Sequence, residues 1–242
     1  MTPEIAHERA RLADIQRFYA SLERLASLAG GARLFSHCTG SQRWPRRGVY
    51  FIFEPREARR ESGTAPRVVR IGTHALKGGS KSTLWGRLSQ HRGTQNPAGG
   101  NHRGSIFRLL IGLALAGRNS SLASPSWGVG SNAPSGVREG ERHLESLVSR
   151  TIGAMSVTWL AIDDDAAPTS LRGYIERNAI ALLSNFGKPA VDSPSPGWLG
   201  SYCPRERVVR SGLWNNNHVE ETYEPDFLDR FDCLIEEMGS HH

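Results

Sequence analysis

Two short runs rich in β-branched and aromatic residues set the strongest limit on the fold of this chain. The run from Gly48 to Glu54 reads GVYFIFE, and the run from Val68 to Gly72 reads VVRIG. Runs of this length and composition are typical of β-strands, and a charged segment containing proline separates the two. They predict a hairpin with a long connection, and Val157 to Asp163 (VTWLAID) predicts a further strand.

Most of the remaining ordered sequence has apolar residues at helical spacing. Gly30-Gly31 is expected to end the first helix, which either covers a face of the sheet or forms a dimer contact. The predicted helices run from Glu4 to Ala29, from Ser82 or Thr83 to Arg92, from Val137 to Ile152, from Pro168 to Ser184 and from Phe227 to Met238. The expected fold class is therefore α+β, a small antiparallel sheet of about three strands flanked by helices.

The chain divides into three predicted parts. Residues 1–47 hold the first helix and a lead-in, residues 48–188 form a core, and residues 189–242 form a loop-rich extension. Within the core, residues 93–140 contain ten glycines and little periodicity apart from Ile106 to Leu115. We expect this glycine-rich stretch to be an insertion outside the hydrophobic core.

Charge and cysteine usage narrow the class of protein. The 30 Lys and Arg residues exceed the 24 Asp and Glu residues, giving a formal net charge of +6 and a pI near 9.6. Most of the excess is arginine, whose planar guanidinium suits phosphate, so a polyanionic partner is favoured. Cys38, Cys203 and Cys233 lack CxxC or Cys/His spacing, which argues against a disulfide framework or a structural zinc.

Hydropathy along the chain predicts a cytoplasmic protein without a membrane partner. Residues 1–11 carry acids and bases rather than an apolar leader, and no apolar run reaches 18 residues.

Three polar side chains stand out on the predicted helices. Arg87 and His91 are four residues apart and share one helix face beside an apolar stripe. Glu176 falls inside the apolar arc of a later helix, where a buried carboxylate needs a cation, a metal ion or solvent. The alternatives are that Arg87 and His91 are solvated surface cations, and that Glu176 pairs with Arg172 at i−4.

The order of these features resembles the GIY-YIG endonuclease superfamily. The resemblance covers residues 48–92 and 157–184, and the insertion and chain length are similar to those of the restriction-enzyme branch. The matching residues are Gly48-Val49-Tyr50, Ile71-Gly72, Arg87, His91 and Glu176. The chain departs from the family pattern at Arg70, where a tyrosine is usual. An asparagine is expected near the end of the Glu helix, and Asn185, nine residues after Glu176, is the candidate.

The resemblance implies an endonuclease that hydrolyses phosphodiester bonds of DNA with Mg²⁺, for which Mn²⁺ can substitute. Glu176 would be the metal ligand, and Arg87 would neutralise charge on the phosphate. Tyr50 would activate water, and Arg70 would favour ionisation of Tyr50 or bind a flanking phosphate. His91 would accept a proton, position water or hold the phosphate.

The expected partner is double-stranded DNA, and a homodimer is one way to cut both strands. Base reading is assigned to the insertion, since arginine and asparagine make bidentate contacts to bases; the alternative is a disordered surface loop. The candidate DNA-binding residues are Lys81, Asn101, His102, Arg103 and Arg108.

Two other functions remain open at this stage. One is a DNA-binding or assembly module that keeps the scaffold with weakened catalysis, and the other is a phosphodiesterase acting on RNA or small nucleotides. Restriction and defence are the biological settings that the resemblance suggests for an active enzyme.

Overall fold

A four-stranded antiparallel sheet forms the centre of the protein. The computed structural model describes residues 3–240. The sheet has the strand order β1-β6-β2-β3, so β2 and β6 are central and β3 lies at one edge. Its strands are β1 (Arg33–Leu34), β2 (Gly48–Ala58), β3 (Pro66–Gly72) and β6 (Ser156–Ala161). The fold class predicted above is confirmed, with the two-residue β1 as an additional strand.

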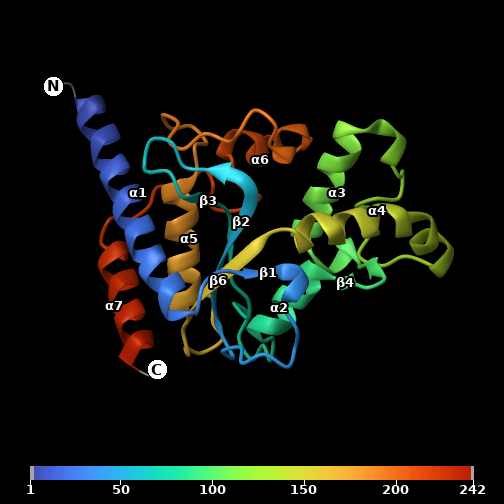
Figure 1. Ribbon diagram of the computed structural model, residues 1–242, viewed down its shortest axis with the longest axis horizontal. Helices are drawn as coiled ribbons and strands as arrows, with labels where there is room; N and C mark the ends of the chain where they lie inside the picture. The colour runs from blue at the N-terminus through green and yellow to red at the C-terminus, as the bar shows by residue number, and fades with distance from the viewer. Residues whose placement is uncertain (1–2, 241–242) are drawn as a thin grey trace.

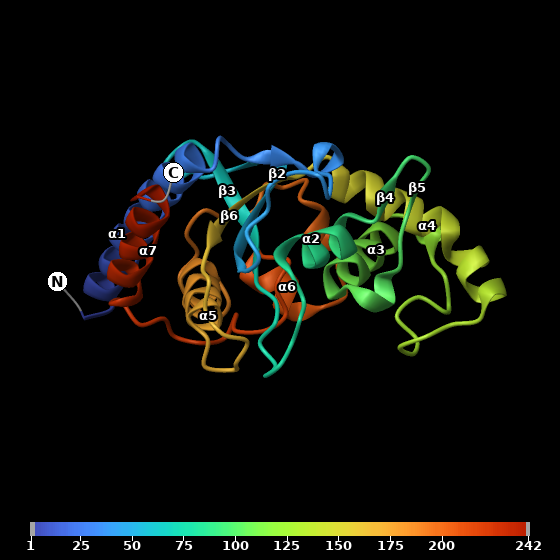
Figure 2. The same cartoon turned by 90° about the horizontal axis from the view of Figure 1, so that it is seen from below.

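Helices cover both faces of this sheet (Figures 1 and 2). On one face lie α1 (Pro3–Leu28), α5 (Leu171–Leu183) and α7 (Phe227–Ser240), and on the other lie α2 (Leu84–Arg92), α3 (Ile106–Arg118) and α4 (Ser135–Gly153). The smaller elements are a β4-β5 hairpin (Thr94–Gln95 and Ala98–Gly99), four short 3₁₀ turns and α6 (Glu206–Ser211). The predicted helices are thus confirmed to within a few residues at their ends.

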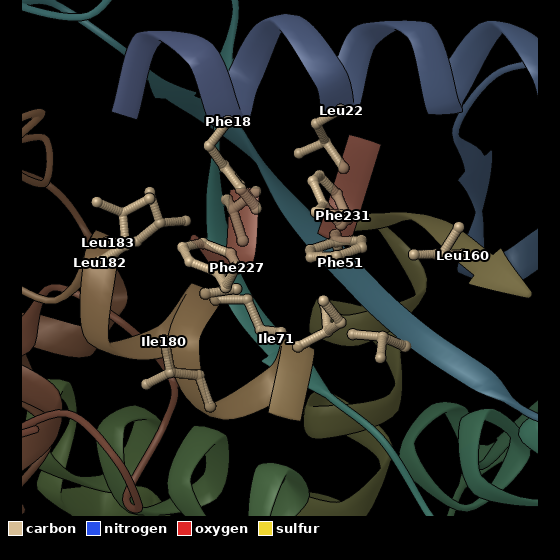
Figure 3. Close-up of a cluster of buried hydrophobic side chains, with 14 of the residues drawn as sticks. Phe18, Leu22, Phe51, Ile71, Leu160, Ile180, Leu182, Leu183, Phe227 and Phe231 are labelled. Carbon is tan, nitrogen blue, oxygen red and sulfur yellow. The ribbon is translucent and has the colours of Figure 1, made fainter. Parts of the chain in front are cut away.

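The alternation of side chains along β2 divides the hydrophobic core into two clusters. Val49 and Phe51 face the first cluster, in which Phe18 of α1 stacks on Phe231 of α7 with ring centroids 5.2 Å apart (Figure 3). α1 therefore covers a face of the sheet, which is one of its two expected roles. Tyr50 and Ile52 face the second cluster.

The glycine-rich stretch belongs to this second cluster, so the prediction that it lies outside the core is wrong. Phe107, Leu110 and Ile111 of α3 and Val148 of α4 are fully buried against the sheet and α2. Several glycines in the stretch are sites of close packing. A Cβ on Gly112, for example, would lie 2.1 Å from the ring of Trp127.

The C-terminal part covers the outer edge of β3. The backbone N–H of Trp214 donates to the carbonyl of Val69 at 2.7 Å, and the Asn215 side chain bonds both main-chain groups of Ile71. These bonds satisfy groups that an edge strand would otherwise leave open. The extension of residues 189–242 therefore completes the sheet edge.

The structure also gives the state of the cysteines and the character of the helices. All three cysteines are free thiols. Within residues 3–240, no helix combines the length and apolar character needed to cross a lipid bilayer.

Gly48 and Gly72 are required by close contacts at the start of β2 and the end of β3. A Cβ on Gly48 would lie 2.3 Å from the carbonyl oxygen of Leu160, and one on Gly72 would lie 2.2 Å from the hydroxyl of Tyr50. Both distances are well below van der Waals contact. The two glycines of the sequence motif therefore let β6 and the Tyr50 ring approach the backbone.

Gly48→Ala is expected to destabilise the protein by about 1–3 kcal/mol, because the backbone carbonyl of Leu160 cannot move aside easily. Gly140→Ala serves as the control, since its Cβ would meet nothing within 4 Å on helix α4. That control should be stabilising by about 0.5–1 kcal/mol. Urea unfolding followed by circular dichroism measures both changes, and equal midpoints for the two variants would contradict the packing argument.

Candidate active site

A chain of three buried side chains runs from the sheet into the helices. The Tyr50 hydroxyl on β2 is hydrogen-bonded to Nε2 of His91 on α2 at 2.7 Å. Nδ1 of His91 is hydrogen-bonded to the Ser105 hydroxyl at 2.7 Å. Tyr50 and His91 are fully buried and Ser105 is 2% exposed, so these contacts replace water. The sequence-predicted Tyr50 and His91 are thus brought together.

Burial keeps His91 neutral. It lowers the pKa of the imidazole well below its usual value, and the charges of Arg70, Arg87 and Arg108 lower it further. A neutral imidazole has one donor and one acceptor nitrogen. One of the two hydroxyl partners therefore donates to the ring while the other accepts from it. His91 is in the form that can take up the Tyr50 proton.

Glu176 approaches the end of β3 from α5. One carboxylate oxygen accepts a hydrogen bond from the backbone N–H of Thr73 at 3.1 Å. Burial raises the pKa of the Glu176 carboxyl, and the positive charge of Arg70 is the largest opposing influence, followed by that of His218. Thr73 directly follows Gly72, which lies against the Tyr50 ring, so Glu176 lies close to the Tyr50–His91 pair. Arg70 and Arg87 act electrostatically on both Glu176 and His91.

Glu176 is not paired with Arg172, which was the alternative interpretation. The Arg172 side chain is fully buried and forms an ion pair with Asp164. It also donates to the carbonyl of His74. Arg172 therefore anchors the loops beside α5 and leaves Glu176 available to the site.

The two arginines differ in how firmly they are held. Arg70 is 5% exposed, donates to the carbonyl of Trp214 and packs over the Phe107 ring at 4.9 Å. Arg87 is partly buried and makes only long hydrogen bonds, to the Gln90 side chain at 3.3 Å and to the carbonyl of Gly104 at 3.4 Å. Neither arginine has an ion pair with a described residue, and Arg87 is the more accessible of the two.

Asn185 lies away from these side chains, and its assignment to the site is wrong. Its amide oxygen accepts from Arg11 and from the backbone N–H of Val191, and its amide nitrogen donates to the carbonyl of Val191. Asn185 therefore stabilises a loop behind α5. The asparagine that reaches β3 beside the site is Asn215, which follows α6 and bonds the main chain of Ile71.

Three of the residues proposed to read bases are held in internal contacts instead. Their assignment to base reading is therefore wrong. Arg108 is fully buried and pairs with Glu145, while His102 is 2% exposed with Nδ1 bonded to the same carboxylate at 2.9 Å. The Arg103 guanidinium forms a bidentate ion pair with Glu141, at 2.6 and 2.8 Å. None of these three side chains presents an exposed charge to DNA.

The other two proposed DNA-binding residues are exposed. The Asn101 side chain accepts from the backbone N–H of Arg103 and caps a short 3₁₀ turn. Lys81 lies in the loop before α2 and forms no ion pair with a described residue. Lys81 alone among the five is an unpaired, exposed cation in this structure.

Several groups at the site were not identified from the sequence: Thr73, Ser105, Trp214, Asn215 and His218. Of these, Ser105 alone had a recognisable signal in the sequence, because a serine directly before an apolar helix is a typical N-cap. In the structure it caps α3 by accepting from the Arg108 backbone N–H. The others act through backbone groups or come from a loop with no periodic pattern.

A metal ion at this site would have little protein ligation. Among residues 3–240, no group of three or more His, Cys, Asp or Glu side chains is arranged to hold a metal. Glu176 offers one carboxylate oxygen that accepts no hydrogen bond from a described residue. That donor set fits Mg²⁺, which commonly takes one or two carboxylates and completes its shell with water and phosphate oxygens.

Ser105→Ala is expected to release His91 from a single ring tautomer and to destabilise α3 by about 1 kcal/mol through loss of its cap. Ser105→Thr keeps both hydrogen bonds and should behave like the unsubstituted protein. ¹H–¹⁵N spectra of the His91 ring report the tautomer without any substrate. A single unchanged tautomer in Ser105→Ala would show that Ser105 does not orient the ring.

Comparison with known proteins identifies a family over nearly the whole chain. A family model described as a GIY-YIG domain matches residues 9–241. The match includes most of the first helix, the glycine-rich stretch and the C-terminal part as well as the strands. No curated protein and no solved structure matches the chain.

Proposed function

This chain belongs to the GIY-YIG family of nucleases, and we propose that it is a magnesium-dependent endonuclease that hydrolyses phosphodiester bonds of double-stranded DNA. The hydrogen bond of 2.7 Å between the Tyr50 hydroxyl and Nε2 of His91 carries the proposal. It pairs a potential nucleophile activator with a neutral base, beside two unpaired arginines and a carboxylate.

In the proposed reaction, water attacks the phosphorus in line with the leaving oxygen. Tyr50 takes a proton from the water while its own hydroxyl proton passes to His91. Arg87 and Arg70 stabilise the negative charge that grows on the phosphate oxygens. Charge-stabilising donors of this kind contribute about 3–4 kcal/mol to other hydrolytic reactions.

Glu176 is the proposed ligand of Mg²⁺, and Mn²⁺ is expected to substitute. When bound, the ion supplies Lewis-acid stabilisation of the phosphate and the leaving oxygen. The carboxylate must be ionised for this role. Arg70 and the Thr73 N–H favour the ionised form of Glu176 against the cost of its burial.

We also propose a setting in restriction or defence against invading DNA. The support is the chain length and the glycine-rich stretch between α2 and α5, which resemble those of the restriction-enzyme branch of the family. One site cuts one strand, so cleavage of both strands calls for a homodimer or for two successive nicks.

One observation favours a second candidate, a DNA-binding module with weakened turnover. Tyr50 and His91 have no exposed surface, so water reaches the Tyr50 hydroxyl only after neighbouring side chains move. An active endonuclease therefore requires that DNA binding exposes the Tyr50 hydroxyl to water. A DNA-binding module has no such requirement.

Plasmid nicking with Mg²⁺ separates these candidates. The unsubstituted protein should nick supercoiled DNA, and Glu176→Gln should lower the rate by roughly 100-fold or more, because removing one charge-stabilising group costs about 3–4 kcal/mol. Glu224→Gln is the control, since Glu224 is exposed and pairs with Arg177. Binding of DNA by the unsubstituted protein without nicking in Mg²⁺ or Mn²⁺ would support the module instead.

The raised pKa of Glu176 predicts where the rate falls in acid. Because ionised Glu176 is required, the rate should drop at a higher pH than for an ordinary glutamate. Arg70→Leu removes the cation that most lowers this pKa, so the acid limb should move to still higher pH and the rate should fall. Arg70→Lys retains the charge and should restore the acid side of the pH–rate profile to that of the unsubstituted protein. A pH–rate profile unchanged in Arg70→Leu would rule out this coupling.

A further inference from the structure

Acidic residues are missing from two long stretches of the sequence. Residues 24–53 contain five Arg residues and no Asp or Glu, and residues 62–138 contain ten Lys and Arg residues and no Asp or Glu. In a chain with 24 acids, such stretches concentrate positive charge wherever the fold brings them together. The second stretch contains Arg87 and the Tyr50 partner His91.

The fold joins these two stretches around α2. The backbone N–H of Leu84 donates to the carbonyl of Arg46 at 2.9 Å, and Nε of Arg92 donates to the carbonyl of Phe35 at 2.9 Å. The partly buried Trp44 and Trp85 rings stack with centroids 5.2 Å apart. These contacts bring the lead-in and α2 side by side, and we define the basic surface by the cations of these segments and of the loop before α2: Arg33, Arg43, Arg46, Lys77 and Lys81.

The cations of the basic surface are not used elsewhere in the structure. None of the five forms an ion pair with a residue in the described range 3–240, and all except Arg33 are exposed. Arg33 packs over the Trp159 ring at 4.7 Å. In the glycine-rich stretch, in contrast, Arg103 and Arg108 are held by Glu141 and Glu145.

Three acids lie nearby on the loop after β6. Asp164 is paired with Arg172, and Asp165 lies 3.9 Å from Arg47, while Asp163 is exposed. The carbonyl of Ala166 in this loop lies 3.9 Å from the Cβ position of Gly78. Asp163 and Asp164 also line one pocket with Arg33 and Arg43, and so does Glu237 of α7. Acids therefore border the basic surface beside these two arginines as well as near Lys77.

We propose that this basic surface binds the phosphate backbone of DNA that flanks the cleaved bond, and that the glycine-rich stretch does not. Arg87 lies one helical turn after Leu84, so the surface leads directly to the proposed catalytic side chains. Unpaired Lys and Arg residues supply the sequence-independent part of DNA affinity. The choice of duplex DNA rests on the proposed function.

Charge reversal tests the proposal. Arg43→Glu, Arg46→Glu and Lys81→Glu are combined, and binding to a fluorescent duplex is measured by anisotropy in EDTA over a range of salt concentrations. Each lost phosphate contact should lower the slope of log K against log salt by about 0.9, so the triple variant should lose about 3 in slope. Its affinity at low salt should be roughly tenfold weaker or worse.

The control combines Arg118→Glu, Arg138→Glu and Arg150→Glu, which are exposed residues on α3 and α4 without described ion pairs. Both triple variants change the formal charge by the same amount, from +6 to 0. The control should keep the slope and affinity of the unsubstituted protein. Thermal unfolding of both variants confirms that these surface changes leave the fold intact.

Equal losses in both triple variants would overturn the proposal, because net charge alone would then explain binding. Unchanged DNA binding in the first triple variant would also overturn the proposal. If the unsubstituted protein still nicks DNA in that case, the proposed function would stand. A loss confined to single-stranded RNA, tested as a competitor, would assign the surface to a different nucleic acid. Absence of both nicking and duplex binding in the unsubstituted protein would instead refute the proposed function.

Discussion

The close approach of the Tyr50 ring to Gly72 determines how the rest of the site is built. No side chain larger than hydrogen fits at position 72 while the ring lies there. The ring position fixes the hydroxyl, and the hydroxyl fixes His91 through a hydrogen bond of 2.7 Å. Ser105 then joins His91 to the start of α3. The hairpin, α2 and α3 are thus coupled through three polar side chains in an apolar cluster, where a lost hydrogen-bond partner is costly.

The glycine-rich stretch has a structural role in this arrangement. Arg108 donates to the carbonyl of His91 at 3.0 Å and pairs with Glu145 on α4. A buried ion pair adds little net stability compared with apolar packing, but removing either partner leaves an uncompensated charge. The Arg108 pair therefore makes one arrangement of α2, α3 and α4 strongly preferred, and with it one position of the His91 ring.

Local patterns in the sequence were sufficient for β2, β3 and β6 and for α1, α2, α4, α5 and α7. They also singled out Arg87, His91 and Glu176 as candidates, whereas Tyr50 became a candidate through the resemblance to the family. Periodicity places a residue on a face, and a face predicts which neighbours it can reach. The glycine-rich stretch was misjudged because its glycines indicate loops when taken alone. In the structure, Gly100 and Gly112 make room for the Arg108 guanidinium and the Trp127 ring. Those tertiary partners are not visible in local composition, and the same holds for Asn215, which acts 144 positions away from Ile71.

The covering of β3 by residues around Trp214 has a consequence for synthesis. A ribosome must translate about 140 further codons after β3 before that segment exists, so the nascent hairpin is left with an unpaired, apolar border. Such a border can recruit other extended chains. Premature termination before residue 213 would therefore yield a polypeptide prone to self-association, in which the strand carrying Arg70 is not fastened in place.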